Sequence, residues 1–341
     1  MAVIEEVLAY YFERPDYCGV QPINNGLINS TYKVNLGIQQ FILQEINTSI
    51  FKAPEIIISN TLQIGHYLKN QHYPKDIMEV IPNLNGNYMT YLNGSTWRLT
   101  RYIPLTICLD KVESKIQAFE AAKAISEFHS YLIDFPMFNI KSSIEGFLDY
   151  QKRVDDYQFA LQNAASNRVE IAKEQIEIIK ENLNLIEEYL AINFPLRIVH
   201  ADAKISNFLF DETHPNKVKA IIDWDTILPG NILCDFGDMV RTYSNLKAED
   251  DPNPFDNFSA ENYEALKEGF LFHLKEHLTA EEIDAMDLTA LVVILVQAIR
   301  FLTDYLNGNI YYQTNYENHN LDRTINQLNL LKAIKEEICI K

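Results

Sequence analysis

The chain has 341 residues, with 29 Lys and Arg against 47 Asp and Glu, so its formal net charge at pH 7 is −18. This acidity argues against nucleic acid as a partner, because such binding depends on Lys and Arg that neutralise phosphates. The four cysteines lack the paired spacing of zinc sites and disulfide frameworks, which favours the reducing cytoplasm. The sequence predicts neither a signal peptide nor a membrane span, because the longest apolar run, Leu288 to Ile299, is too short to cross a bilayer.

The first hundred residues predict a small antiparallel sheet with one long helix. After a short helix over 4–13, we expect strands near 32–34 and over 40–46, a helix over 54–70, and strands over 76–81, 88–92 and 96–103. Asn85-Gly86 and Asn93-Gly94 separate the last three strands, and Asn-Gly between apolar runs is the strongest short-range hairpin signal. We place the end of this first lobe at Ile103, so the lobe covers residues 1–103.

Beyond residue 103 the periodicity becomes helical. Apolar residues recur three and four apart over 112–132, 144–165 and 169–192. Further helices are expected over 260–278, 280–285, 288–306 and 321–337. His129 is expected to pack at the end of its helix and not to act as a ligand. The pattern predicts an α+β fold of two lobes, the second one mostly helical and covering residues 104–341.

The most informative stretch runs from Leu196 to Arg241. There His200-x-Asp202 ends a short apolar run, Asn207 follows Asp202 by five residues, and the next strand ends in Asp223. Phosphoryl transfer needs an Asp that accepts the proton of the attacking hydroxyl, and an Asn and a second Asp that hold magnesium against the phosphates. Asp and Asn are also common turn residues. Their order along two strands nevertheless favours a kinase site with Asp202 as base and Asn207 and Asp223 as magnesium ligands.

This arrangement resembles the catalytic loop and metal-binding Asp of the aminoglycoside phosphotransferase-like kinases. The resemblance implies an enzyme that uses ATP and Mg²⁺ and has a protein kinase-like fold with a small antiparallel sheet in its first lobe. Asp225 is then a candidate for a second metal contact. The later Asp235, although Phe236-Gly237 follows it, is expected to be structural: it would cap its helix and tie it to the catalytic loop.

The resemblance also implies that the first lobe binds the nucleotide. The turn from Pro22 to Asn29 would cover the phosphates, with Asn29 and Thr31 as contacts, although a plain hairpin loop fits this turn equally well. The backbone of Arg101, Tyr102 and Ile103 would form the hinge that contacts adenine.

Gln44 departs from the kinase pattern. Most kinases have a lysine in this strand position, where it pairs with the nucleotide phosphates and a helix glutamate. We still count Gln44 as a nucleotide contact, but the departure leaves Glu55 without its expected partner. Lys33 or Lys52 would be the replacement, unless both are ordinary surface lysines.

Three stretches resemble the N-acetylhexosamine 1-kinase branch: residues 32–48, residues 202–230, and residues 300–323. The branch implies transfer of phosphate to the anomeric hydroxyl of the sugar. Lys204 would lie beside the transferred group, while Arg300 and Tyr311 would hold the sugar. The alternative for Arg300 is a surface salt bridge with Asp304, four residues later. Trp224 departs from this branch, which often has a smaller apolar residue there.

Two other classes of function stay open. A kinase of a cationic or amino-alcohol acceptor, such as an aminoglycoside, choline or homoserine, would suit the acidity of the chain. A non-catalytic binding protein with a kinase fold would explain the missing lysine, but the joint presence of Asp202, Asn207 and Asp223 argues against it. The expected partners are ATP and a small-molecule acceptor, first of all an amino sugar, and neither nucleic acid nor a membrane.

Overall fold

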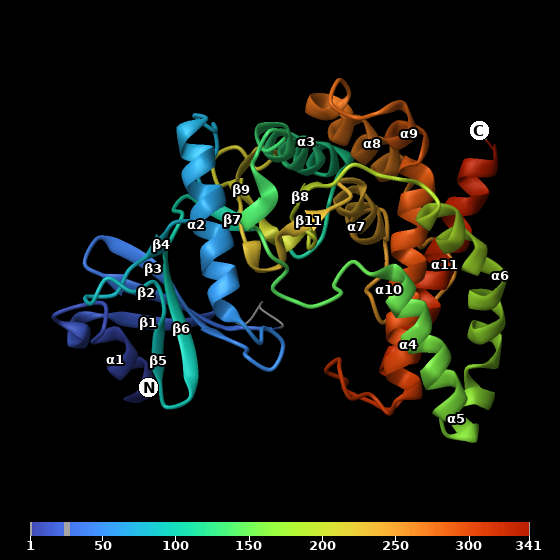
Figure 1. Ribbon diagram of the computed structural model, residues 1–341, viewed down its shortest axis with the longest axis horizontal. Helices are drawn as coiled ribbons and strands as arrows, with labels where there is room; N and C mark the ends of the chain where they lie inside the picture. Colours follow the sequence, from blue (N-terminus) through green and yellow to red (C-terminus); the bar gives the residue numbers. More distant parts are fainter. Residues whose placement is uncertain (1, 24–27, 341) are drawn as a thin grey trace. The chain divides into compact units, whose positions relative to one another are not determined.

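A computed structural model describes residues 2–23 and 28–340, and Figure 1 shows its elements. Packing groups the chain into two compact units. The first comprises Met1–Cys108, Asp134–Glu145 and Asn207–Pro229, and the second comprises Leu109–Ile133, Gly146–Ser206 and Gly230–Lys341. The predicted lobe boundary at Ile103 stays a prediction. By packing, the segment that carries Asn207 and Asp223 belongs to the unit with the sheet.

The first unit is built on an antiparallel sheet to which six strands of the described chain belong, in the order β1-β2-β3-β6-β4, with β5 also paired to β6. The strands are β1 (Gly19–Ile23), β2 (Ser30–Leu36), β3 (Gln39–Ile46), β4 (Val80–Ile81), β5 (Thr90–Leu92) and β6 (Ser95–Arg101). Asn93 and Gly94 have φ of 51° and 82°, so the predicted Asn-Gly hairpin joins β5 to β6. The hairpin predicted at Asn85-Gly86 is wrong in its pairing: a turn forms, but in the fully described stretch 80–101 both β4 and β5 pair with β6.

Two helices cover the two faces of this sheet. Helix α1 (Ala2–Leu8) covers one face, where its Leu8 and Leu43 of β3 belong to the same buried apolar cluster. It ends five residues earlier than the predicted helix over 4–13. Helix α2 (Pro54–Asn70), which has the predicted bounds, covers the other face, where its Ile57 and Ile46 of β3 belong to a second buried cluster. Because alternate residues of a strand point to opposite sides, even-numbered β3 positions, including Gln44, lie on the α2 face.

A second sheet in the first unit carries part of the catalytic stretch. Its strands are β7 (Thr106–Cys108), β9 (Phe208–Asp211) and β10 (Val218–Ile221), in the order β10-β9-β7. Strands β9 and β10 form a hairpin between Asn207 and Asp223, and the N–H of Ile222 donates to the carbonyl of Asn207 at 2.9 Å. The hairpin therefore brings the backbone at Asn207 beside the end of β10. A short 3₁₀ turn, η4 (Trp224–Thr226), follows, and the buried Trp224 lies beside α2.

The second unit is mostly helical. Its helices are α3 (Lys115–Tyr131), α4 (Tyr150–Asn163), α5 (Ser166–Ile171), α6 (Lys173–Leu190), α7 (Leu233–Tyr243), α8 (Ala260–Leu274), α9 (Ala280–Asp284), α10 (Met286–Leu306) and α11 (His319–Ile340). The helix predicted over 144–165 begins only at Tyr150, where Asp149 caps it by accepting the N–H of Lys152 at 2.9 Å. The helix predicted over 169–192 is broken at Ala172 into α5 and α6.

Helix α10 forms the core of the second unit. It has 21 residues, and an 18-residue window within it has a mean hydropathy of 1.8, so within the described chain it is the one helix long and apolar enough to cross a membrane. The predicted run was shorter, but its reading as a core helix fits, because 67% of its apolar window is buried inside the protein. It packs against α4, α6, α7 and α11 (Figure 1). Gly237 permits the contact with α7, since a Cβ there would lie 2.6 Å from Cγ2 of Val293.

Candidate active site

The two predicted catalytic residues lie together in the loop that follows β8 (Arg197–Val199). Nζ of Lys204 is 2.8 Å from Oδ2 of Asp202, and the two side chains are 35% and 26% exposed. The carboxylate can therefore be reached from solvent. A lysine at this distance also supplies positive charge where negative charge develops during phosphoryl transfer.

Asp235 holds the start of this loop. Its buried carboxylate accepts the backbone N–H groups of His200 and Ala201 at 2.7 and 2.6 Å. Ala201 has a φ of 61°, a left-handed conformation that is uncommon for a residue with a side chain. The predicted link between Asp235 and the catalytic loop is present. The predicted N-cap role is wrong, because Asp235 lies within the first turn of α7 and the side chain of Asn231 accepts the N–H of Leu233 instead.

His129 completes the support of the loop. Its Nε2 is 3.0 Å from Oδ2 of Asp235, and its Nδ1 donates to the carbonyl of Ile198 at 3.1 Å. Burial alone would raise the pKa of Asp235, but the hydrogen bond and charge of His129, together with the charge and backbone N–H of His200, outweigh burial, and the pKa is lowered. His129 is thus a polar partner of Asp235 and not merely the packing residue that we expected. On the other side of the loop, the Tyr243 hydroxyl donates to the carbonyl of Ala203 at 2.9 Å.

Asn207 and Asp223 suit a magnesium ion held jointly with phosphates. They lie at the two ends of the β9–β10 hairpin in the first unit, and Asp223 adopts a left-handed conformation with φ 62° and ψ 58°. Over residues 2–23 and 28–340, no three His, Cys, Asp or Glu side chains gather as a metal site. Mg²⁺ is commonly bound by only one or two carboxylates, with phosphates and water completing its shell. One side-chain oxygen each from Asn207 and Asp223 would suit this mode of Mg²⁺ coordination.

Asp225 does not fit its predicted role as a second metal contact. Its Oδ1 accepts Nη1 of Arg98 at 2.6 Å, and its Oδ2 accepts Nη2 of Arg98 at 3.0 Å and Nδ2 of Asn29 at 2.9 Å. The residue is 2% exposed. Both oxygens are therefore engaged and the charge is neutralised by a guanidinium, so we correct the assignment: Asp225 is one half of a buried ion pair.

The side chains predicted to contact phosphate are hydrogen-bonded to this ion pair or to one another. Oε1 of Gln44 accepts Nε of Arg98 at 2.9 Å, and Nε2 of Gln44 donates to Oγ1 of Thr31 at 3.3 Å. Together with Asn29, these side chains bind one another in the first unit. Residues 24–27 of the predicted phosphate-covering turn, which runs from Pro22 to Asn29, lie outside the described residues. Glu55, expected to lack a lysine partner, accepts the hydroxyl of Tyr91 at 2.8 Å.

The predicted hinge is partly used within its own unit. The N–H of Arg101 donates to the carbonyl of Glu79 at 2.9 Å, and that of Tyr102 donates to Gln40 at 3.1 Å. These two N–H groups already donate within the first unit and are therefore not available to adenine, although the predicted hinge includes both residues. Of the three predicted contacts, the N–H of Ile103 is the one with no acceptor among the described residues. The hinge residues also line a cavity of about 300 Å³ together with Lys69, Lys75, Asp76, Ile77, Glu79 and Pro104.

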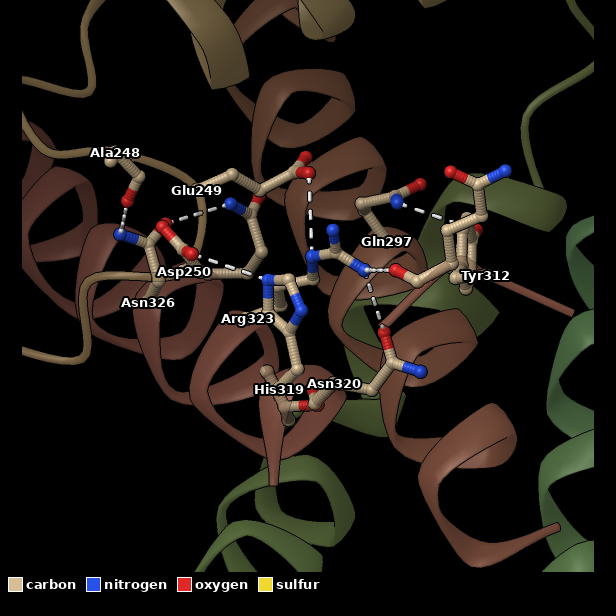
Figure 2. Close-up of polar contacts among 12 residues, drawn as sticks. Ala248, Glu249, Asp250, Gln297, Tyr312, His319, Asn320, Arg323 and Asn326 are labelled. Carbon is tan, nitrogen blue, oxygen red and sulfur yellow. Dashed lines mark hydrogen bonds and ion pairs between the residues drawn. The ribbon is translucent and has the colours of Figure 1, made fainter. Parts of the chain in front are cut away.

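A charged network that we did not predict begins beside Asp202 in the second unit. Oδ1 of Asp238 accepts Nε and Nη2 of Arg241 at 3.0 and 2.9 Å. Nη1 of Arg241 donates to Glu249 at 3.2 Å. Glu249 in turn lies 3.8 Å from Nε of Arg323 (Figure 2). Burial raises the pKa of Asp238, and the nearby Asp202 carboxylate raises it further against the opposing effect of Arg241. Two acids and two arginines alternate, so their formal charges cancel.

Arg300 and Tyr311, the predicted sugar contacts, belong to a second set of polar contacts in the same unit. Nη1 of Arg300 donates to Gln297 at 2.9 Å, and the guanidinium is 5.8 Å from the ring centre of Tyr312. Gln297 in turn reaches the Tyr312 hydroxyl at 3.5 Å (Figure 2). The alternative partner, Asp304, is engaged elsewhere: it accepts the backbone N–H groups of residues 310, 311 and 312 at 2.9, 2.8 and 3.0 Å. Asp304 therefore shapes the turn that presents Tyr311, which is 58% exposed.

The sequence matches the phosphotransferase enzyme family over residues 19–272. The chain belongs to this family. Membership confirms the predicted superfamily and the predicted enzyme class, a phosphotransferase with an alcohol group as acceptor. The finer assignment to the N-acetylhexosamine branch stays a prediction.

Solved structures share the fold along almost the whole chain. A microcompartment-associated aminopropanol kinase superposes with a TM-score of 0.68 at 16% identity, covering 99% of this chain and 97% of that one. A spectinomycin phosphotransferase in complex with ADP and spectinomycin gives 0.65 at 12% identity and covers 98% of both chains. A choline/ethanolamine kinase family protein from Mesorhizobium loti gives 0.63 at 16% identity, covering 98% of this chain and 94% of that one. These similarities confirm the two-lobed kinase-like α+β fold.

Proposed function

We propose that this phosphotransferase transfers the γ-phosphate of ATP to the anomeric hydroxyl of an N-acetylhexosamine. Asp202 accepts the proton of that hydroxyl as its oxygen bonds to the γ-phosphorus. The bond between this phosphorus and the bridging oxygen breaks, and ADP leaves with the bonding electrons. Asn207 and Asp223 would hold magnesium, which offsets the phosphate charge. Lys204, 2.8 Å from Asp202, steadies the negative charge that develops.

The arginine cluster around Arg300 is the observation that carries the choice of acceptor. Burial lowers the pKa of Arg153, and the charge of neighbouring Arg300 lowers it further against the opposing effect of Asp156. Two guanidinium groups therefore lie near each other here, and one of them is 3.8 Å from the Asp156 carboxylate. Such a pair would repel an ammonium group. It suits the neutral hydroxyl and amide oxygens of an acetamido sugar, because the guanidinium presents several N–H donors in a rigid fork. The exposed Tyr311 offers a ring and a hydroxyl to the same ligand.

A kinase of an amino alcohol or aminoglycoside is the second candidate. Asp238 lies close to Asp202, and Glu249 is joined to Asp238 through Arg241. Carboxylates in this place would attract a cationic acceptor. The names of the structurally similar proteins, which include an aminopropanol kinase and a spectinomycin phosphotransferase, support the same class. Both carboxylates, however, are paired with Arg241. This pairing lowers their attraction for a cation, which is why we propose the sugar as the acceptor.

An acceptor screen by ADP release tests the proposal. N-acetylglucosamine, N-acetylgalactosamine, choline, ethanolamine, 1-amino-2-propanol and spectinomycin would each be offered with ATP and Mg²⁺, and the Asp202→Asn variant would report background hydrolysis. We expect turnover with the two acetamido sugars, and none with their methyl 1-glycosides, in which the anomeric hydroxyl is blocked. Turnover of an amine with both sugars inert would overturn the acceptor assignment and leave the family activity intact.

Arg300→Ala is the matching test on the protein. We expect the KM for the sugar to rise about tenfold or more, since lost hydrogen bonds to a ligand cost about 1–2 kcal/mol, while the KM for ATP changes little. Arg168→Ala is the matched control, because Arg168 also packs on a tyrosine, 4.7 Å from the ring centre of Tyr305. An equal effect of both variants on the sugar KM would show that Arg300 acts only through stability.

A further inference from the structure

Arg98 carries a charge in the interior of the first unit. It is 1% exposed and lies on β6 directly opposite Gln44 of β3. Its three nitrogens each have a partner: Nε donates to Gln44, and Nη1 and Nη2 donate to the two oxygens of Asp225. A bidentate pair of this kind is a strong and directional hydrogen-bonded contact. Removing one partner would leave a buried charge uncompensated.

The ion pair fixes the backbone turn that follows Asp223. Asp225 belongs to η4, which begins immediately after Asp223, and the left-handed conformation of Asp223 is strained for a residue with a side chain. Strain of this kind persists only where the surroundings enforce it. Here the Ser143 hydroxyl donates to the carbonyl of Asp225, and Nδ2 of Asn60 donates to that of Ile227 at 3.1 Å. Arg98 stabilises the same turn through its two hydrogen bonds to the side chain of Asp225.

The neutral residue at position 44 follows from the same contacts. Oε1 of Gln44 accepts Nε of Arg98, and the two residues face each other across paired strands. A lysine in this position would place a second cation against a buried guanidinium and would remove the acceptor of Nε. The departure from the kinase pattern and the buried arginine are therefore two parts of one arrangement.

We propose that Arg98 is a positioning residue of the phosphotransferase: its ion pair with Asp225 fixes the turn that orients Asp223 toward magnesium. Gln44 is neutral because it is the partner of Arg98. The inference rests on the magnesium and ATP dependence in the proposed function, and it is independent of the acceptor.

The test measures Mg²⁺-dependent ATP binding by calorimetry without any acceptor, at a temperature well below unfolding. Arg98→Met should raise the Mg²⁺ concentration for half-maximal ATP binding by about 10- to 100-fold, the usual effect of losing a group that orients a metal ligand. Arg98→Lys keeps the charge but not the fork, and should recover only part of the affinity. Unchanged half-saturation in Arg98→Met would overturn the inference. If the wild type binds ATP without any Mg²⁺ dependence, the metal-dependent part of the proposed function fails as well.

Two further variants separate positioning from stability. The double variant Arg98→Met with Asp225→Leu replaces the buried pair by apolar side chains, which commonly restores folding. We expect its melting temperature to recover and its Mg²⁺ affinity to stay weak. Recovery of both would mean that Arg98 only stabilises the unit. Arg197→Met is the matched control, because Arg197 also donates to both oxygens of one buried carboxylate, that of Glu282 in the second unit. It should lower stability and leave the Mg²⁺ dependence unchanged, and an equal loss of Mg²⁺ affinity would count against positioning.

The Gln44→Lys variant distinguishes this inference from its alternative, because the two predict opposite changes in Mg²⁺-ATP binding. If the strand position were simply an empty lysine site, restoring the lysine would strengthen Mg²⁺-ATP binding. We expect it to lower the melting temperature and weaken binding, and we expect Gln44→Lys combined with Arg98→Gln to recover stability by moving the charge from β6 to β3. Tighter binding by Gln44→Lys alone would overturn the inference.

Discussion

Replacing Asp235 by Asn removes a buried charge that holds the catalytic loop. The carboxylate has no exposure, accepts N–H groups of His200 and Ala201 at 2.7 and 2.6 Å, and lies 3.0 Å from Nε2 of His129. Asn keeps the shape but offers only one oxygen, so at least one of these donors loses its acceptor. Breaking a buried charged pair costs about 3–5 kcal/mol. We expect the free energy of unfolding at pH 7 to fall by about this amount.

The loss should depend on pH, because the pKa of Asp235 is lowered in the folded protein. A carboxyl of this kind contributes its full stability above its unfolded pKa of about 4, and the contribution disappears as the pH falls through the lowered value. Urea unfolding of the wild type and Asp235→Asn should therefore show a difference that is large at pH 7 and shrinks below about pH 4. An equal difference at both pH values would refute the role of the ionised carboxylate. Unchanged stability with lost Mg²⁺ dependence would instead make Asp235 a metal ligand.

Two further predictions concern the reacting groups. Asp202→Asn should lower kcat by about 100-fold or more, as for loss of a positioned base, while ATP affinity in a fluorescence titration changes little; an undiminished kcat would remove Asp202 from the mechanism. Asp223→Asn, which tolerates the left-handed backbone, should raise the Mg²⁺ concentration needed for half-maximal ATP binding with little change in melting temperature. A Mg²⁺ dependence equal to that of the wild type would contradict its role as a metal ligand.

Local signals in the sequence predicted many elements and some of their ends. Helix α2 has the predicted bounds because Pro54 suits the first helical position and the apolar face is continuous to residue 70. The break between α5 and α6 has no such signal. It falls at Ala172, a good helix former, whose backbone leaves the helical region with φ −90° and ψ 10°. Periodicity continues across the break, so a single helix was the natural prediction.

The sequence predicted the site residues that lie close together along the chain. It missed the side-chain partners that depend on contacts between distant segments. Asp202, Asn207 and Asp223 fall within one stretch of fixed spacing. The partner of Gln44 depends on the pairing of β3 with β6, which joins positions 54 residues apart. The signal for it was a charged residue, Arg98, between two apolar residues of a predicted strand. The network from Arg241 to Arg323 joins α7, the following loop and α11, and only the first of its contacts, to Asp238, is a helical neighbour.

Asp223 and Asp225 show how burial assigns different roles to identical side chains two residues apart. For Asp225 to bind a cation, it would have to give up two charge-assisted hydrogen bonds from Arg98 and leave a guanidinium unpaired at 1% exposure. That cost is of the order of several kcal/mol. Asp223, at intermediate exposure beside the end of β10, does not carry this cost. A divalent cation is therefore expected to bind Asp223 and not Asp225, because the guanidinium of Arg98 already neutralises the Asp225 carboxylate.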